Sequence, residues 1–284
     1  MSTLEFRLSC PEDIGQMKTL WQLVFGDTVE YIHNFFNALH DPGTAIVCLD
    51  SKRVVAMVHL LDAGMLTVSR PLRISYTYAL ATHPDYRRMG IATRLLDEAK
   101  KQSARRGFDA NILCPAEESL FVYYKKRDYF SCFFIQEAWI KAASDLRQIE
   151  VTPLSTAEYM ADRLLYLGTD MPQLTVPVRV IDYVRTVTEA QGGGLFRLAV
   201  NGQAGVAAVG RNNDELFFHE ILGTFLIKAT AQSLCRQLSA VRALVRTQPF
   251  KNAEDFLNTR PFGMISYANQ QDDFAGYFPF ALDL

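Results

Sequence analysis

The sequence predicts an α/β protein in which a mixed sheet is flanked by helices, and this layout occurs twice along the chain. In each half, helical periodicity comes first and then changes to the alternation of strands. A polar turn joins two strands as a hairpin in each half, at 50–52 and at Asn201-Gly202. The second half then repeats the order of elements of the first. This repeat is one of architecture only, since the identity between the halves is too low to demonstrate it.

The first half begins with the alternating segment LEFRLS at 4–9, which predicts a short strand. Pro11-Glu12-Asp13 opens a helical pattern that runs to Val24, and Thr28 can cap a second helix. Three strands follow, in the segments TAIVCLD, RVVAMVHLL and PLRISYTYALATH. The half ends with a helix after residue 90, a strand at 110–114, a helix at 117–128 and a strand at 130–140.

The segment 141–150 is polar and aperiodic, so it predicts a connection between two domains, 1–142 and 143–284. Helical patterns near 155–167 and 177–190 open the second domain. The segment LFRLAVNGQAGVAAVGR then predicts a hairpin about Asn201-Gly202, the strongest short hairpin signal of the chain. The remaining predicted elements are a strand in ELFFHEILG, a helix over 223–238 and a strand in AVRALVRT.

Composition argues against several classes of protein. The 284 residues are 49% hydrophobic with a formal net charge of -2, which is an ordinary globular composition, and the chain is long enough for two domains. The charge balance gives no reason to expect nucleic acid as a partner. The N-terminus lacks the layout of a signal peptide, and no apolar run approaches the roughly 20 residues that span a bilayer. We therefore expect no membrane partner and a cytoplasmic location.

The five cysteines are scattered, odd in number and form no CxxC pair. Metal ligation requires clustered donors, and a disulfide framework usually requires an even count. We expect reduced core thiols and no metal. Cys114 as a nucleophile would need a histidine base, and the sequence identifies none for it.

The segment THPDYRRMGIATRLLDEAK (82–100) contains an amphipathic helix with an unusual beginning. No Ser, Asp or Asn precedes it to accept its free N–H groups, and Arg87 and Arg88 add positive charge where the helix dipole is already positive. Gly90 lets the backbone turn tightly and approach a ligand. These features predict an anion, a pyrophosphate, as the missing cap. His83 precedes Pro84, which predicts a structural or solvent-facing histidine rather than a base.

The segment ALATHPDYRRMGIATRLL resembles the acyl-CoA signature of the Gcn5-related N-acetyltransferases, in which an (Arg/Gln)-x-x-Gly-x-(Gly/Ala) loop wraps the CoA pyrophosphate. The strand before the loop and the amphipathic helix after it match the context of that motif. The resemblance implies that the preceding strand splays from the next, binds the pantetheine through its backbone and polarises the thioester carbonyl. The implied acetyl-CoA-binding residues are Leu80, Ala81, Thr82, Arg87, Arg88, Met89, Gly90, Ile91, Ala92 and Thr93.

The segment LFVYYKKRDYF (120–130) resembles the family's later stretch, (Phe/Leu)-Tyr-Glu-Lys-x-Gly-Phe. The resemblance places Tyr124 where many members have the tyrosine that protonates the departing CoA thiolate. A phenol with a pKa near 10 suits that role. Asp128 stands where the family has Gly, which leaves the alignment open by one residue and Tyr123 as the alternative acid.

The tandem layout is similar to that of the enhanced intracellular survival type acetyltransferases, in which a degenerate copy of the acyl-CoA N-acyltransferase fold follows the active one. The second half has no phosphate-loop motif, so we expect it to wall the acceptor pocket or to mediate assembly into a homo-oligomer. That group also implies a C-terminal carboxylate as general base. Here this would be the carboxylate of Leu284, with Asp283 beside it, at the end of the apolar segment FAGYFPFALDL.

The sequence therefore predicts an acetyl-CoA-dependent N-acetyltransferase that moves an acetyl group directly to the primary amine of a small molecule. Two alternatives remain open. The chain could bind acyl-CoA without turnover, or its acceptor could be a protein amine. The sequence leaves open the identity of the acceptor amine and the length of the acyl group.

Overall fold

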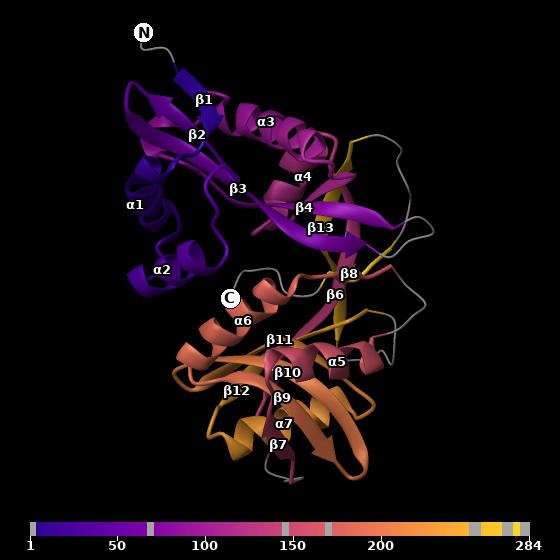
Figure 1. The fold of residues 1–284 in the computed structure, drawn as a ribbon. Coiled ribbons are helices and arrows are strands. Elements are labelled where there is room, and N and C mark those ends of the chain that lie inside the picture. The colour runs from indigo at the N-terminus through magenta and orange to yellow at the C-terminus, as the bar shows by residue number, and fades with distance from the viewer. Residues whose placement is uncertain are drawn as a thin grey trace. The chain divides into compact units, whose positions relative to one another are not determined.

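The computed structural model describes residues 4–66, 71–143, 148–167, 172–249, 257–268 and 275–278. The chain forms two compact units (Figure 1). Unit 1 draws on Met1–Ser131, Thr175–Pro177 and Gly263–Asp273, and unit 2 on Cys132–Leu174, Val178–Phe262 and Phe274–Leu284. The two units therefore interleave along the chain. The division into an active domain 1–142 and a degenerate domain 143–284 stays a prediction.

The sheet of unit 1 is mixed. Four antiparallel strands come first, β1 (Leu4–Leu8), β2 (Ala45–Asp50), β3 (Arg53–Leu66) and β4 (Leu72–Thr82). β5 (Ala110–Leu113) pairs with β4 in parallel, which requires a crossover connection between the two strands. Beyond β5, residues Met264 to Tyr267 of β13 (Asn258–Tyr267) pair with it antiparallel.

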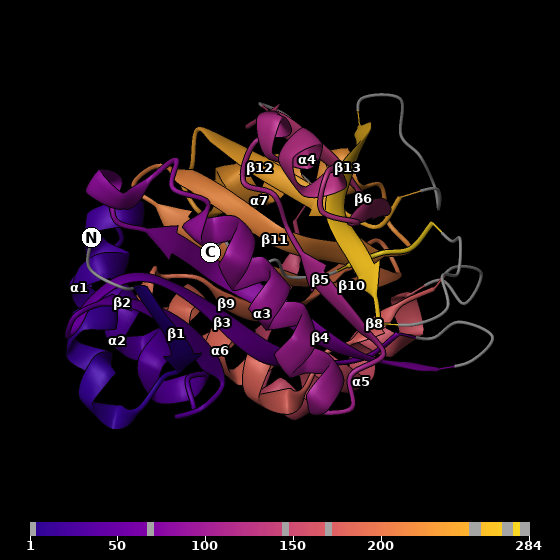
Figure 2. The same cartoon turned by 90° about the horizontal axis from the view of Figure 1, so that it is seen from above.

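Helices cover both faces of this sheet (Figures 1 and 2). The crossover helix α3 (Ile91–Arg105) packs its apolar side on β2 and β3. α1 (Ile14–Phe25) and α2 (Val29–Ala38) cover the other face, where Trp21 and Phe35 pack around His59 of β3. α4 (Glu118–Lys125) follows β5. Thr28 caps α2 as expected, since its hydroxyl accepts the N–H of Tyr31 at 3.2 Å.

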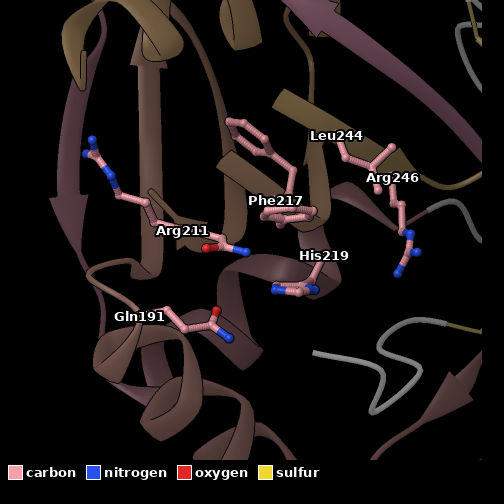
Figure 3. Close-up of a pocket in the computed structure, with 8 residues that line it drawn as sticks. Gln191, Arg211, Phe217, His219, Leu244 and Arg246 are labelled. Atoms are coloured by element: carbon pink, nitrogen blue, oxygen red, sulfur yellow. The ribbon is translucent and has the colours of Figure 1, made fainter. Parts of the chain in front are cut away.

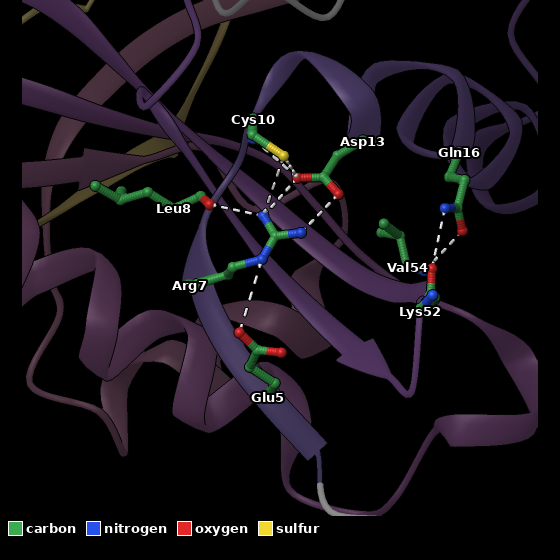
Figure 4. A network of polar contacts seen from close by, with 8 residues as sticks. All are labelled: Glu5, Arg7, Leu8, Cys10, Asp13, Gln16, Lys52 and Val54. Atoms are coloured by element: carbon green, nitrogen blue, oxygen red, sulfur yellow. Dashed lines mark hydrogen bonds and ion pairs between the residues drawn. The ribbon is translucent and has the colours of Figure 1, made fainter.

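An ion pair fastens the beginning of the first helical segment to β1 (Figure 4). Arg7 donates to the two carboxylate oxygens of Asp13 at 2.6 and 2.9 Å, and the Cys10 N–H donates to the same carboxylate at 2.8 Å. Asp13 is only 3% exposed. The hydrogen bond from Arg7 lowers the pKa of Asp13 from 3.8 to about 2.

Because this pKa is lowered on folding, the Asp13 carboxylate stabilises the fold above about pH 4 and loses that effect as the pH falls towards about 2. We expect Asp13→Asn to lower the free energy of unfolding by about 2 kcal/mol at pH 7 and to be neutral below about pH 2. Urea unfolding over a pH series measures both effects, with exposed Asp97→Asn as the control. A loss of stability that does not depend on pH would contradict the assignment.

The sheet of unit 2 repeats the strand pattern of unit 1. β7 (Glu150–Pro153), β9 (Gly194–Val200), β10 (Gln203–Asn212) and β11 (Glu215–Gly223) are antiparallel neighbours in that order. β12 (Arg242–Thr247) then pairs in parallel with β11. From Cys132 on, β6 (Phe130–Lys141) belongs to this unit and pairs antiparallel with β12.

Helices flank the second sheet as well. α7 (Ile227–Gln237) packs on one face, against a core that includes Phe218 and Val245. α5 (Thr156–Tyr166) and α6 (Val178–Ala190) contact β10 on the other face. This alternation of α and β elements around mixed sheets confirms the predicted fold class.

A buried ionic network holds the C-terminal segment 275–278 to unit 2. Arg163 of α5 donates to both carboxylate oxygens of Glu220 at 2.6 and 2.9 Å. The hydroxyls of Tyr159 and Tyr277 donate to the same carboxylate at 3.0 and 2.7 Å. Glu220 is fully buried, so these four hydrogen bonds satisfy a charge that would be costly alone.

The predicted elements are present with boundaries close to those expected, and the structure adds three strands. β7 and the two-residue β8 (Leu174–Thr175) lie where the sequence analysis predicted no strand, and β13 carries Pro261, which weakens a strand signal. Among the described residues, no helix is long and apolar enough to cross a bilayer.

Candidate functional site

The loop before α3 has the strained backbone that the sequence predicts for a ligand-binding turn. Gly90 is the N-cap residue of α3 with φ 77°, and Arg88 also has a positive φ of 63°. For a non-glycine residue this left-handed conformation is costly, and such strain clusters at functional sites. Residues 87–90 are all exposed, so the loop is accessible to a ligand.

The first turn of α3 has no internal cap. The helix receives no side-chain cap hydrogen bond, and its first internal bond runs from the N–H of Arg94 to the carbonyl of Gly90. Within the described part of the chain, the N–H groups of Ile91, Ala92 and Thr93 therefore have no partner, at the positive end of the helix dipole. This arrangement suits a phosphate group.

β4 and β5 separate next to this loop. The two strands pair from Ile74 to Tyr76 of β4 and no further. Ala79 has a positive φ of 49° and lies in a bulge, where two residues of β4 stand opposite one residue of β3. Among the described residues, no strand pairs with Leu80 to Thr82 on the side of β5. This part of β4 therefore offers backbone groups to a ligand that adds alongside it.

A buried polar network marks the point of separation, and the sequence analysis missed it. Asn111 of β5 accepts from the hydroxyls of Thr77 and Tyr129 at 2.5 and 2.6 Å. Its amide nitrogen donates to Ser75 and Ser103, each at 3.2 Å. Thr77 is the first residue of β4 beyond the paired stretch, so the network joins β4, β5 and α3 where the two strands part. In the sequence, this network is indicated only by single polar residues, Ser75, Thr77 and Asn111, within otherwise apolar strand segments.

We expect Asn111→Ala to lower the free energy of unfolding by about 3 kcal/mol, because it leaves the Thr77 and Tyr129 hydroxyls buried without an acceptor. Urea unfolding measures this loss. Asn37→Ala, on the exposed side of α2, is the matched control and should change the stability by less than about 0.5 kcal/mol. Equal stabilities for the two variants would show that the network is not fully formed in solution.

The two tyrosines of α4 have different surroundings. Tyr123 is tied to α3, since its hydroxyl lies 3.3 Å from Thr93 Oγ1 and the Arg127 guanidinium lies 3.5 Å from its ring centroid. Tyr124 packs against the buried cluster that contains Leu113 of β5, and Leu80 of β4 packs against the same cluster. Its hydroxyl has no hydrogen-bond partner among the described residues. Burial raises the pKa of Tyr124 to about 12, so the phenol stays protonated at neutral pH.

Thr93, His83 and the C-terminal residues remain from the sequence analysis. Thr93 accepts from Arg127 Nε and Nη2 at 3.1 and 2.7 Å, which leaves only its backbone N–H for a ligand. His83 Nε2 lies 2.8 Å from Arg53 Nη2, and His83 Nδ1 accepts the N–H of Asp85 at 3.3 Å, contacts that suit the structural role predicted for it. Leu284 and Asp283 lie outside the described residues, and the prediction of a terminal base stays a prediction.

In unit 2 the described connection from β11 to α7 differs from the loop before α3. The chain passes from β11 to α7 through Gly223, Thr224 and Phe225, and the N-cap residue Leu226 has φ −71°. Phe225 is 5% exposed, and its ring lies so close to Gly205 and Gly223 that a Cβ on either would clash with it. An aromatic side chain therefore fills the space beside the beginning of α7.

Comparison with known proteins finds a family model that matches part of the chain. Residues 5–131 match the model described as an acetyltransferase (GNAT) domain. These residues are therefore similar to a GNAT domain. The matched part contains the loop, the parted strands and both tyrosines. No curated protein matches the sequence.

Solved structures extend the likeness in fold to nearly the whole chain. A GCN5-related N-acetyltransferase from Anabaena variabilis matches with a TM-score of 0.68 and 14% identity, over 94% of this chain and 73% of that one. Eis1 from Mycobacterium abscessus matches with a TM-score of 0.64 and 11% identity, over 93% and 73%. A tandem GNAT protein from the clavulanic acid biosynthesis pathway matches with a TM-score of 0.57 and 14% identity, over 95% and 100%. The tandem arrangement of the fold is therefore shared with known GNAT proteins.

Proposed function

We propose that this chain is an acetyl-CoA-dependent N-acetyltransferase that transfers the acetyl group directly to the primary amine of a small molecule. The observation that carries the proposal is the uncapped first turn of α3 behind Gly90, next to the unpaired edge of β4. An anion-binding turn beside an open strand suits a ligand that joins a pyrophosphate to an extended pantetheine arm.

In the proposed mechanism the acceptor amine attacks the thioester carbonyl while both substrates are bound. The pyrophosphate accepts hydrogen bonds from the N–H groups at the beginning of α3 and ion pairs with Arg87 and Arg88. Backbone N–H groups between Leu80 and Thr82 stabilise the negative charge that develops on the carbonyl oxygen. Tyr124 donates its proton to the leaving thiolate, a role that suits a phenol protonated at neutral pH.

The function is tested by incubating the protein with acetyl-CoA and a panel of amines, alcohols and thiols, and by following the release of free CoA. Release of CoA with small amines, and none with the alcohols or thiols, would support the proposal. Turnover with a lysine peptide but with no small amine would favour the protein-amine alternative. Acetyl-CoA binding without turnover on any acceptor would favour the non-catalytic alternative.

The general base that we propose is the carboxylate of Leu284. This proposal rests on the tandem resemblance, since Leu284 lies outside the described residues. We expect deletion of residues 283–284 to lower kcat by about 100-fold at pH 7 without changing the Kd for acetyl-CoA. Leu284→Ala, which keeps the terminal carboxylate, is the control. Unchanged turnover after the deletion would exclude this base.

A further inference from the structure

Unit 2 contains a pocket of about 310 Å³ on the sheet face opposite α7 (Figure 3). Phe217 and Leu244 line it, and their neighbours Phe218 and Val245 belong to the core cluster beneath α7, as strand alternation requires. Phe218 contributes to both, since it also borders the pocket. Its volume lies at the lower end of the range for small-molecule sites. The lining residues come from β10, β11, β12 and the end of α6, and they are Gln191, Arg211, Asn212, Phe217, Phe218, His219, Leu244 and Arg246.

His219 lies in the pocket because β11 bulges there. Ala208 pairs with Glu220 and Val209 pairs with Phe218, so His219 is the extra residue between them. The side chain is nine-tenths buried, and its Nε2 has no hydrogen-bond partner among the described residues. A buried polar atom without a partner is costly, and a ligand would supply the missing hydrogen bond. Burial lowers the pKa of His219 to about 3, so the ring stays neutral.

Gly210 leaves room where two polar side chains converge. A Cβ at this position would lie 2.3 Å from Gln191 Oε1 and 2.8 Å from His219 Nε2. Both atoms therefore lie over the bare backbone of Gly210, and within the described residues the Gln191 side chain also has no hydrogen-bond partner. A glycine inside a strand often marks the close approach of a ligand.

The charge of the pocket favours an anion. Arg211 and Arg246 line it, and among the described residues that line it none is acidic. Arg246 donates through Nε to Glu137 at 2.6 Å, and Glu137 also accepts from Arg260 Nε at 3.0 Å. Because the guanidinium groups of Arg246 and Arg260 share the single carboxylate of Glu137, these three side chains together keep a net positive charge. Arg246 also has donors left over, since no other hydrogen bond occupies it in the described part of the chain.

An apolar wall adjoins these donors. The ring of Phe217 stands 5.8 Å from the ring of Trp139 in an edge-on contact, and Leu244 lies beside Phe217 in the pocket. Trp139 is 47% exposed, and the guanidinium of Arg242 lies 4.1 Å from its ring centroid. A flat apolar group would cover this wall, and a planar anion would place its charge at Arg246.

We infer that this pocket is a binding site for a small aromatic carboxylate. The carboxylate accepts hydrogen bonds from Arg246 and from His219 in the tautomer that protonates Nε2, and the ring packs on Phe217 and Leu244. The described lining residues all belong to unit 2, so this proposal does not depend on the acetyl-CoA site proposed in unit 1. Unit 2, without a phosphate loop, thus has a ligand site of its own.

The test is isothermal titration of benzoate into the full chain, with benzylamine, benzamide and inorganic phosphate as comparison probes. We expect benzoate to bind with a stoichiometry of one. Benzamide, which keeps the ring without the charge, and phosphate, which keeps charge without the ring, should each bind about tenfold more weakly or not at all. Equal binding of phosphate and benzoate would overturn the assignment of the ligand class, and no heat from benzoate would overturn the site.

Two variants test the location of the site. Gly210→Ala fills the space between Gln191 and His219, and Arg246→Gln removes the charge while leaving Glu137 paired with Arg260. Each should weaken benzoate binding by about tenfold or more. Arg236→Gln, on the exposed side of α7, is the matched control and should bind as the wild type does. Wild-type binding in both pocket variants would overturn the proposal. A urea-unfolding transition like that of the wild type shows that a variant is folded.

Discussion

A chain that carries Arg88→Glu and Gly90→Asp together should lose acetyl-CoA binding, with a Kd at least about 100-fold above that of the wild type. Two carboxylates would then stand at the beginning of α3, where they would cap the free N–H groups themselves and repel the pyrophosphate. A side chain at position 90 also meets the positive φ of 77°, which glycine tolerates best. Isothermal titration of acetyl-CoA measures the effect directly.

The matched control is Arg105→Glu, which makes the same charge change in the last turn of the same helix. Its Kd for acetyl-CoA should stay within about threefold of the wild type, because the helix end lies about 20 Å from the first turn at 1.5 Å per residue and its charge is screened. If the double variant binds acetyl-CoA as the wild type does, the loop is only a turn and the proposed function fails. That outcome would leave the site proposed in unit 2 unaffected.

Tyr124→Phe should lower kcat by about 10²- to 10⁴-fold and leave the Kd for acetyl-CoA unchanged. The ring keeps its packing against the cluster that contains Leu113, and only the proton donor is removed. Because the pKa of Tyr124 is about 12, its protonated form persists through the neutral range, and its loss should reduce the rate only above about pH 11. Steady-state kinetics, with the Kd measured by titration, separates the loss of chemistry from a loss of binding.

Tyr123→Phe is the control for this prediction. Its hydroxyl contacts Thr93 at 3.3 Å and Arg127 lies over its ring, so we interpret it as a link between α4 and α3. We expect kcat within about threefold of the wild type. If Tyr123→Phe shows the large fall instead, the acid is Tyr123 and the family alignment is shifted by one residue.

Local signals explain why much of the fold was predictable. In the two hairpin turns φ is positive, at 60° for Ser51, 52° for Asn201 and 77° for Gly202. Asn and Gly are the residues that adopt this conformation most easily. Thr28 caps α2 through a bond within four residues. The loop at 87–92 was recognisable for the same reason, since its chemistry depends on neighbouring residues of one helix end.

Other features depend on pairing across long stretches of chain. β13 pairs with β5, whose residues lie about 150 positions earlier, and Pro261 within it gives the signal of a poor strand. In the sequence, Asn111 is a single polar residue in an apolar segment. Its four partners come from β4, from α3 and from Tyr129, which precedes β6. The bulge at His219 depends on the register of β10 against β11, which no local pattern encodes.

The sequence by itself determined the order of the main helices and strands, the α/β class and the uncapped beginning of α3 behind Gly90. These depend on periodicity, turn chemistry and helix capping, which act over a few residues. Only the tertiary structure decided which strands complete each unit, where β4 and β5 part, and which polar groups are buried without a partner. Strand register and burial arise from contacts between distant residues, and it is those contacts that place Tyr124 beside the parted strands and His219 in a pocket of its own.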